Sequence, residues 1–355
     1  MKQKTGFALL GTGLVAPFHA KAIQNSEKCE LIAVADIDEK RAGDFASQFD
    51  CAAYRQLEDL LEDDAVDVIN ILTPNHQHKE AVIRAAKAHK HLLVEKPPAM
   101  SLTDVDEMIA VCREQNVKLG IVLQCRVRKA VQAVREAIRQ GRFGKLLHAD
   151  AYMKWYRSTE YYHSDPWRSS RKSGAGVTIQ HAFHYIDLLY YLAGPVKNLH
   201  ARMANLAHPD VELEDTVLAF LNYENGAQGV VQASTALYPG TDLRIEINGT
   251  DGTAVIVGER IDTWKFKEEL PEDEEIRKTG SAATATAATG PADFSFADHQ
   301  VVIEDMADAI ENDREPVIAA PLTRGTLEIA LAMYKSANIG NEVHLPLEDE
   351  NDVWD

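Results

Sequence analysis

The sequence has few cysteines, no long hydrophobic run and too few basic residues to balance its acidic ones. Only four of its 355 residues are cysteine, and none forms a Cys-x-x-Cys pair. Neither a metal site nor a disulfide framework is therefore predicted. No stretch reaches the ~18 apolar residues of a membrane span, and Met1 to Gly6 are too short and polar for a signal peptide. We expect a cytoplasmic protein with reduced thiols.

The shortage of basic residues excludes two kinds of partner. Lysine and arginine number 37 against 55 aspartates and glutamates, which gives a net charge of −18. Nucleic acids and anionic membranes both select a basic surface, so neither is expected to bind. The apolar fraction of 45% is ordinary for a globular protein, and the length suggests about two domains.

The first part of the chain alternates short apolar runs with amphipathic helical patterns. Continuous apolar runs are typical of strands buried on both faces, as in a parallel sheet. The runs are 7–10, 31–34, 68–72, 92–94 and 119–122, and the helical patterns are 14–25, 39–49, 75–88 and 103–116. This alternation predicts an α/β domain with a doubly wound parallel sheet, a Rossmann domain, over residues 1–123.

The pattern changes in residues 124–355, which we predict to form a second, α+β domain. Alternating runs between 196 and 257 predict an open, mostly antiparallel sheet with helices on one face. The other predicted elements are helices at 127–140, 181–193, 298–312 and 323–338 and a strand at 145–157. The last helix should pack against something large, and the first domain is one candidate. The acidic composition of 268–292 predicts a mobile surface loop outside the core.

A glycine-rich turn follows the first predicted strand and opens the first helix. It reads Gly11-Thr-Gly13-Leu-Val-Ala16, a G-x-G-x-x-A pattern whose glycines let the backbone approach a pyrophosphate at the helix N-terminus. Asp36 ends the second strand, where a carboxylate binds ribose hydroxyls and repels a 2′-phosphate. Because Ile37 follows and not arginine, NAD is predicted over NADP.

Two polar motifs follow later strands of the predicted sheet. Thr73-Pro-Asn-His76 and Glu95-Lys96-Pro97 both lie at carboxyl ends of strands, where open α/β sheets bind ligands. Burial there can lower the pKa of a lysine into a useful range, so Lys96 is a catalytic candidate. A solvated surface lysine is the alternative. Pro97 is predicted to follow a cis bond.

A third motif runs from Gly174 into an apolar helix. Gln180, His184 and Asp187 are spaced at i, i+4 and i+7 and should share one helix face. A histidine on such a face is more often a core residue than a catalyst, but its pairing with Lys96 favours catalysis. The basic helix 126–139 is typical of a solvated face, although Arg126 or Arg128, just after a strand, can reach the site.

Together these motifs resemble the glucose-fructose oxidoreductase / inositol dehydrogenase (Gfo/Idh/MocA) family over nearly the whole chain. The resemblance implies a tightly held nicotinamide cofactor, a sugar or cyclitol substrate, and an open sheet that supports a homodimer or homotetramer. It implies that Lys96 contacts the reacting hydroxyl, that His184 is its acid/base partner, and that Trp167 and Arg168 lie against the cofactor.

Lys96 and His184 are thus the predicted catalytic residues. The predicted cofactor-binding residues are Gly11, Thr12, Gly13, Leu14, Asp36, Thr73, Pro74, Asn75, His78, Glu95, Lys96, Gln124, Trp167 and Arg168. The predicted substrate-binding residues are Lys96, Arg157, Tyr162, Gln180 and His184. Many inositol-dehydrogenase-like relatives carry Asp where this chain has Gln180. Because glutamine does not titrate, an Asp–His relay is excluded, and the proton must rest on Lys96 or His184.

The substrate class is narrowed by two observations. Trp155-Tyr-Arg157, Tyr161-Tyr162 and Tyr238-Pro239 look like the branch of the family that oxidises UDP-N-acetylglucosaminuronate at C3. Residues 120–180 hold twelve basic and four acidic residues, whereas 268–275 and 342–355 supply six acids each. The segment predicted to line the site is therefore basic, which favours an anionic sugar, although solvated helix faces explain the same count.

The predicted activity is hydride transfer between a secondary hydroxyl of a sugar, sugar derivative or cyclitol and NAD. One alternative is an NAD-dependent glycosidase that oxidises C3 transiently; such relatives tend to carry export signals, which are not seen here. The other is a non-catalytic, NAD-sensing binding protein, against which the intact Lys96 and His184 count.

Overall fold

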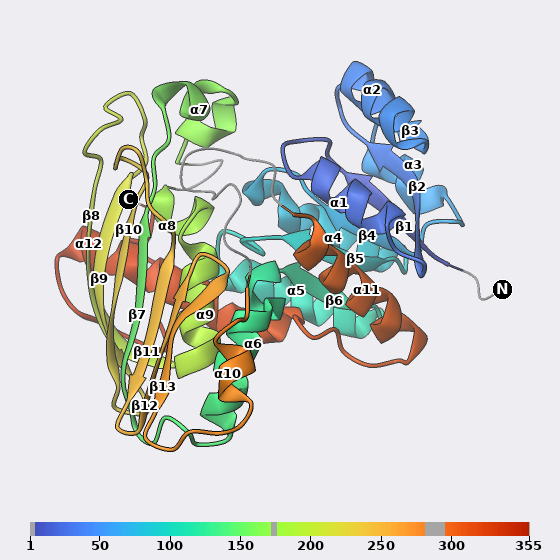
Figure 1. Ribbon diagram of the computed structural model, residues 1–355. Coiled ribbons are helices and arrows are strands. Elements are labelled where there is room, and N and C mark those ends of the chain that lie inside the picture. The colour runs from blue at the N-terminus through green and yellow to red at the C-terminus, as the bar shows by residue number, and fades with distance from the viewer. Residues whose placement is uncertain (1–3, 172–175, 281–294, 355) are drawn as a thin grey trace. The chain divides into compact units, whose positions relative to one another are not determined.

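The computed structural model describes residues 4–171, 176–280 and 295–354, and it divides into two compact units (Figure 1). The first unit is Met1–Gln124 with Ser295–Arg324, and the second is Cys125–Phe294 with Gly325–Asp355. Helix α11 (Ala297–Glu311) therefore joins the first unit, contrary to the predicted division. The reason is packing: a Cβ on Gly120 would lie 2.8 Å from the Met306 methyl carbon, so the missing side chain makes room for this helix.

The first unit has the predicted parallel sheet, in the order β3-β2-β1-β4-β5-β6. Its strands are β1 (Thr5–Leu10), β2 (Cys29–Ala35), β3 (Ala52–Tyr54), β4 (Val68–Ile71), β5 (His91–Glu95) and β6 (Leu119–Val122). The strand order reverses between β1 and β4, which is where doubly wound sheets bind ligands. The sequence did not predict β3, because its alanines are exposed and carry no apolar run.

Helices connect these strands, and all of them except α3 were predicted by the alternating pattern. They are α1 (Ala16–Gln24), α2 (Glu39–Phe49), α3 (Leu57–Glu62), α4 (His78–Lys87) and α5 (Leu102–Glu114), with a 3-10 turn η1 (Asn75–Gln77) before α4. Side-chain caps set two of the starts: Asp38 accepts from the first backbone N–H groups of α2, and Ser101 accepts from Asp104 N in α5.

The second unit has the predicted mostly antiparallel sheet, in the order β13-β12-β11-β7-β10-β9-β8-β14. Among the described strands of this sheet, only β7 and β10 pair in parallel. The strands are β7 (Leu146–Lys154), β8 (Val196–Ala204), β9 (Thr216–Tyr223), β10 (Gln228–Ser234), β11 (Arg244–Gly249), β12 (Gly252–Val257), β13 (Arg260–Phe266) and β14 (Val343–His344).

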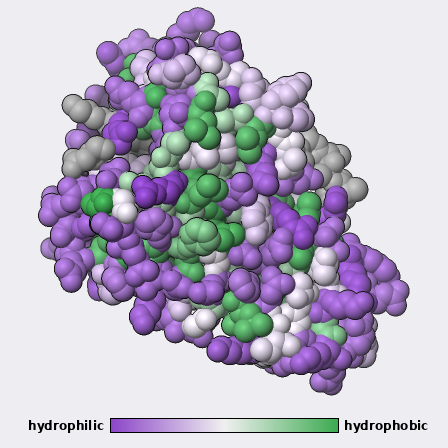
Figure 2. All heavy atoms as spheres, turned by 90° about the vertical axis from the view of Figure 1, so that its left-hand side faces the viewer, coloured by the Kyte–Doolittle hydropathy of each residue, from purple (hydrophilic) through white to green (hydrophobic). Residues whose placement is uncertain are grey.

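One face of this sheet is covered and the other is exposed. Along β9, Val217, Ala219 and Leu221 are buried, while the alternate residues Leu218 and Phe220 are exposed. Figure 2 shows hydrophobic groups gathered among polar ones on the side of the molecule where β8 and β9 lie. The helices of the unit are α6 (Lys129–Arg139), α7 (Thr159–His163), α8 (Val177–Gln180), α9 (Phe183–Ala193), α10 (Asp273–Ile276) and α12 (Arg324–Ile339).

The last helix, α12, packs inside the second unit. Thr326 donates to Asp187 in α9, Tyr334 donates to Glu214, and the Ser336 hydroxyl accepts from Ala201 N in β8. This helix was predicted to pack against something large, and in the structure it contacts a helix and a strand of its own unit.

The acidic run at 268–275 is not simply a surface loop. Asp273 is fully buried, and its two oxygens accept hydrogen bonds of 2.7 Å from Arg142 and one of 2.6 Å from the Trp264 indole. The Arg142 guanidinium, opposed by burial, holds the pKa of this carboxyl well below its usual range. The expectation that the run lies outside the core is therefore wrong for Asp273, and residues 281–292 of the predicted loop lie outside the described residues.

Across residues 4–171, 176–280 and 295–354, no helix combines the length and apolar character that a membrane crossing requires.

Candidate active site

The predicted dinucleotide turn joins β1 to α1 in the first unit. Gly11 has φ +102°, and a Cβ at this position would lie 3.0 Å from the Leu72 carbonyl oxygen, so a side chain would be strained. A Cβ on Gly13 would meet no atom of the described residues within 4 Å, which leaves space beside the backbone. Ala16 is fully buried where the helix meets the sheet, and Leu14 is 49% exposed. The turn thus has the space that the close approach of a pyrophosphate needs.

Asp36 follows β2 and is bonded to the same turn. Its Oδ2 accepts hydrogen bonds from Thr12 N at 2.9 Å and from the Thr12 hydroxyl at 2.6 Å. Burial acts to raise the pKa of Asp36, but these bonds and the backbone N–H of Asp38 outweigh it and lower the pKa. The carboxylate is thus held ionised at the end of the strand, as ribose binding requires.

The turns after β4 and β6 carry buried polar atoms that no described residue satisfies. They are Thr73 Oγ1, Asn75 Nδ2 and Gln124 Oε1. Pro74 stands between the first two and is the N-cap of η1. A buried polar group without a partner is costly, so such atoms mark places where a ligand supplies the missing hydrogen bonds. All three residues are in the predicted cofactor-binding set.

Lys96 follows the last residue of β5 and is half-buried. The peptide bond between Lys96 and Pro97 is cis, as predicted. His78 does not reach outward: it is fully buried, and its two ring nitrogens each lie 2.9 Å from a backbone oxygen, of Thr73 and of Pro97. Glu95 is also buried and bonds to His19, a residue that the sequence analysis did not select.

In the second unit, two arginines pack on one tyrosine ring. The guanidinium carbon of Arg157 lies 5.5 Å from the centroid of Tyr161, and that of Arg168 lies 4.9 Å from it. Arg168 also stacks over Trp167 at 4.5 Å and donates to the Tyr161 hydroxyl at 2.9 Å. Burial lowers the pKa of the Arg157 guanidinium, yet arginine remains charged at neutral pH. Tyr161 therefore lies in one cluster with the predicted residues Arg157, Trp167 and Arg168. The predicted substrate-binding residue was its neighbour, Tyr162.

That neighbour, Tyr162, is buried instead. Its hydroxyl lies 2.6 Å from Thr235 Oγ1, and burial raises its pKa. Its ring packs on His208, whose Nε2 lies 2.9 Å from the Arg157 carbonyl oxygen and whose Nδ1 lies 2.8 Å from Asp215. This Asp215–His208 pair supports the backbone that carries Arg157.

A buried carboxylate supports the segment that carries Gln180. Glu214 accepts from Thr178 N at 3.0 Å and from the Tyr334 hydroxyl at 2.7 Å, and burial raises its pKa. A Cβ on Gly176 would lie 1.9 Å from this carboxylate, so only glycine fits at the start of α8. The last glycine of the motif, Gly176, thus leaves room for the carboxylate of Glu214.

The expected continuous helix face does not form. Helix α8 ends at Gln180, and α9 begins only at Phe183, so Gln180 and His184 lie on separate helices.

Asp187 is fully buried and accepts two hydrogen bonds from Arg126, of 2.8 and 2.5 Å. Arg128 pairs with Glu259 at 3.0 Å. Asp187 and Arg126 therefore form an internal ion pair, and Arg126 is not part of a solvated face.

Comparison with known proteins assigns the family. The model of the oxidoreductase family with an NAD-binding Rossmann fold, GFO_IDH_MocA, matches residues 5–122, and the model of the GFO/IDH/MocA C-terminal domain matches residues 131–255. The chain belongs to the Gfo/Idh/MocA family of NAD-binding oxidoreductases, as its motifs predicted.

Its relatives include sugar and cyclitol dehydrogenases. Myo-inositol 2-dehydrogenase of Thermotoga maritima is 28% identical over 69% of this chain and 72% of its own length. The WlbA dehydrogenase of Bordetella pertussis, solved with NADH and UDP-GlcNAcA, is 30% identical and covers 98% of this chain and 100% of its own, with a TM-score of 0.87. The Chromobacterium violaceum WlbA complex with the same ligands is 28% identical over 98% of each chain, with a TM-score of 0.88.

Proposed function

We propose that this enzyme oxidises a secondary hydroxyl of an anionic sugar, with UDP-GlcNAcA as the leading candidate, and passes the hydride to NAD⁺. Oxidation of such a hydroxyl removes a hydride from carbon and a proton from oxygen. When bound, the nicotinamide supplies the hydride acceptor. The chain must then accept the proton, and Lys96 and His184 are the groups proposed to do so.

The residues of the first unit fit the cofactor. The open space at Gly13 and the ionised carboxylate of Asp36 suit a pyrophosphate and an adenosine ribose. The unsatisfied atoms of Thr73, Asn75 and Gln124 offer hydrogen bonds at the carboxyl ends of the strands. These residues are proposed to hold NAD, together with the other members of the predicted cofactor set except His78, whose buried ring faces backbone carbonyl oxygens.

The pair of guanidinium groups on Tyr161 is the observation that supports an anionic substrate. Arg157 is 6% exposed, and its planar cation packs between aromatic rings, since Trp155 lies 5.1 Å from it. A rigid guanidinium binds carboxylates and phosphates through two parallel hydrogen bonds. Similarity to the two WlbA enzymes over the whole chain supports the same substrate class.

A substrate series tests this proposal. With NAD⁺, turnover measured as NADH absorbance should be fastest with UDP-GlcNAcA, slower with UDP-GlcNAc and slowest with myo-inositol. The variant Arg157→Met should lower kcat/KM for UDP-GlcNAcA by about 10- to 100-fold, because a hydrogen bond to a charged group contributes about 1.5–3 kcal/mol.

Arg135→Met is the matched control, since Arg135 is an exposed arginine of the same unit that donates to the Tyr191 carbonyl oxygen at 2.7 Å. It should keep wild-type kinetics. Equal turnover of UDP-GlcNAc and UDP-GlcNAcA, or an equal loss on all three substrates in the Arg157 variant, would reject the carboxylate as the recognised group.

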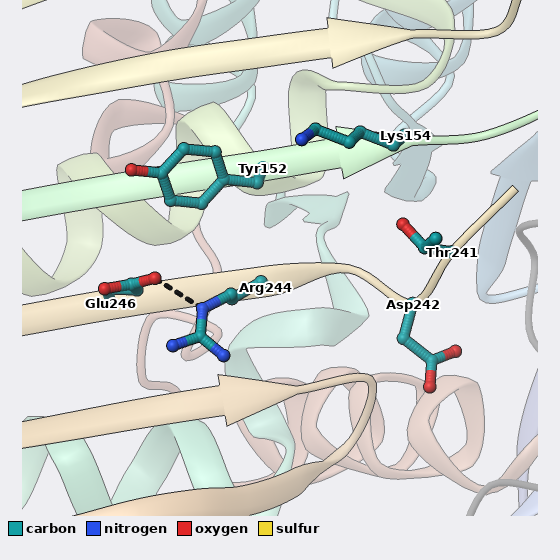
Figure 3. Close-up of a pocket in the computed structure, with 6 residues that line it drawn as sticks. All are labelled: Tyr152, Lys154, Thr241, Asp242, Arg244 and Glu246. Carbon is teal, nitrogen blue, oxygen red and sulfur yellow. Dashed lines mark hydrogen bonds and ion pairs between the residues drawn. The ribbon is translucent and has the colours of Figure 1, made fainter. Parts of the chain in front are cut away.

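We also propose that the exposed face of the eight-stranded sheet joins two copies of the chain. The apolar side chains of Leu218 and Phe220, 48% and 67% exposed, stand on this face. On the same sheet, separated from β9 by β10, lies a shallow pocket of about 290 Å³ on β7, β11 and the loop before β11 (Figure 3). Its lining is Tyr152, Lys154, Thr241, Asp242, Arg244 and Glu246. A face that carries both cations and carboxylates can pair with itself across a two-fold axis.

Light scattering should therefore give at least twice the mass of one chain. Phe220→Glu, which puts a charge at the centre of the apolar face, should give the mass of a single chain with unchanged circular dichroism. A wild-type protein that is monomeric at micromolar concentration would contradict the proposal.

A cytoplasmic location is proposed on the state of the thiols. None of the four cysteines is in a disulfide, and Cys29, Cys112 and Cys125 are buried. Free buried thiols are usual in reducing compartments. Fractionation of the source cells should place the protein with cytoplasmic enzymes, and recovery from a membrane or extracellular fraction would contradict this.

A further inference from the structure

Two buried histidines contact the residues on either side of Lys96. His19, in α1, bonds through Nε2 to Glu95 Oε1 at 3.0 Å. His78, at the start of α4, has Nδ1 2.9 Å from the carbonyl oxygen of Pro97. Both histidines have no exposed surface. All of these residues belong to the first unit, so the arrangement is a property of that unit alone.

The His19 contact extends into the sheet. The amide nitrogen of Asn70, in β4, lies 3.0 Å from His19 Nδ1. An amide nitrogen only donates, so Nδ1 accepts from Asn70 and Nε2 is the ring nitrogen that faces Glu95. The other carboxylate oxygen, Oε2, accepts from the backbone N–H of Lys96 at 3.2 Å. Asn70, His19 and Glu95 thus form a chain of hydrogen bonds that ends on the peptide of Lys96.

The charge of Glu95 stabilises this chain. Burial alone would raise the pKa of Glu95, but the His19 hydrogen bond and neighbouring positive charges bring it down to about 2. The carboxylate is therefore ionised at every working pH, and a charge-assisted hydrogen bond is stronger than a neutral one.

The His78 contact joins two turns. Its Nε2 lies 2.9 Å from the carbonyl oxygen of Thr73, so one ring spans the turn after β4 and the turn after β5. Burial lowers the pKa of His78, although the contacts with the two carbonyl oxygens act to raise it. Neither histidine has an exposed edge, so both serve the backbone of these turns and not the ligand directly.

We propose that His19 and His78 are positioning residues for Lys96, His19 through the carboxylate of Glu95 and His78 through the carbonyl oxygen of Pro97. This rests on the proposed function, in which Lys96 contacts the reacting hydroxyl. Lys96 directly follows the last residue of β5, so the sheet restrains the backbone on only one side of it. Here the residues on both sides, Glu95 and Pro97, contact other elements. The restraint fixes the point from which the lysine side chain extends.

The test compares His19→Ala and His78→Ala with their glutamine counterparts, His19→Gln and His78→Gln. Each alanine variant should lower kcat for UDP-GlcNAcA by about 10- to 100-fold, the effect of misplacing a reacting group by about 1 Å. Each glutamine variant should recover part of this loss, because an amide can still donate one hydrogen bond.

His91→Ala is the matched control. His91 opens the same strand at its other end, and its Nδ1 accepts from the backbone of Lys118 at 3.0 Å. Its removal deletes a comparable histidine–backbone contact far from Lys96, so kcat should stay at the wild-type value. Thermal unfolding of every variant separates loss of fold from loss of position.

A second readout needs no substrate. Trace labelling of amines with acetic anhydride, followed by peptide mass spectrometry, gives the reactivity of Lys96 relative to the exposed Lys87. This ratio should rise in the two alanine variants, where the lysine is less restrained, and stay constant in His91→Ala.

Three results are decisive. Wild-type kcat and labelling in both alanine variants, with an inactive Lys96→Met enzyme, would overturn the positioning role and leave the proposed function intact. An active Lys96→Met enzyme would remove Lys96 from the proposed chemistry and leave the proton to His184, and the kcat of the histidine variants would then no longer report on Lys96. His299 is the third member of a group with His19 and Glu95 whose ligand atoms lie within 4.8 Å of one another. One Zn²⁺ per chain that survives dialysis and is lost in His299→Ala would make these residues ligands and overturn the inference.

Discussion

Replacing Lys96 with methionine should lower kcat by about 100- to 10,000-fold, the usual contribution of a positioned acid or base. Methionine keeps most of the lysine stem but has no ammonium group. If Lys96 acts only on the reacting hydroxyl, kcat and kcat/KM should fall together, while the Kd for NADH from fluorescence titration stays nearly unchanged. The measurement is initial-rate kinetics at saturating NAD⁺ with UDP-GlcNAcA.

Lys87→Met provides the control, because Lys87 is an exposed lysine at the end of α4 in the same unit. It should behave as the wild type. Turnover by the Lys96 variant at more than a tenth of the wild-type rate would remove Lys96 from the proposed chemistry and leave the proton to His184.

The second large effect is on stability. Asp187→Ala should destabilise the second unit by about 3–5 kcal/mol, because it leaves the Arg126 guanidinium buried without its carboxylate. Arg126 is 4% exposed and Asp187 is 0% exposed, and the Thr326 hydroxyl also donates to Asp187 at 2.7 Å. All four tryptophans belong to the second unit, so tryptophan fluorescence in urea reports the unfolding of that unit alone.

Two further variants give this prediction its controls. Glu136→Ala removes one acid of an exposed ion pair with Arg139, and it should leave the urea midpoint nearly unchanged. Arg126→Met combined with Asp187→Leu removes both buried charges and should regain much of the lost stability. A midpoint for Asp187→Ala that matches that of Glu136→Ala would show that the pair does not stabilise the fold.

The cofactor side of the site was predictable because its signals are local. A glycine that must adopt φ +102° after a buried strand, and an acid at the end of the next strand, stand at known spacings in the chain. The cofactor set was therefore predicted from motifs. His78 shows the limit of that approach: it belongs to a motif, but its two ring nitrogens each lie 2.9 Å from a backbone carbonyl oxygen inside the unit.

The substrate side was less predictable because adjacent residues of a short helix point in different directions. Tyr161 and Tyr162 both stand in α7, and the sequence offers no reason to choose between them. In the structure Tyr161 packs with the two arginines, and Tyr162 is buried on Thr235. His19 was missed because its partners come from β4 and β5, which no helical pattern relates to α1.

By itself, the sequence determined the class of fold, the sheet types of both units, the family and the choice of cofactor. These properties depend on periodicity and on short motifs, and both are formed by residues that are close together in the sequence. Only the tertiary structure decided which charged groups pair inside the protein, as Asp187 does with Arg126 and Asp273 with Arg142. A buried charge needs a partner, and packing brings that partner from a distant part of the chain.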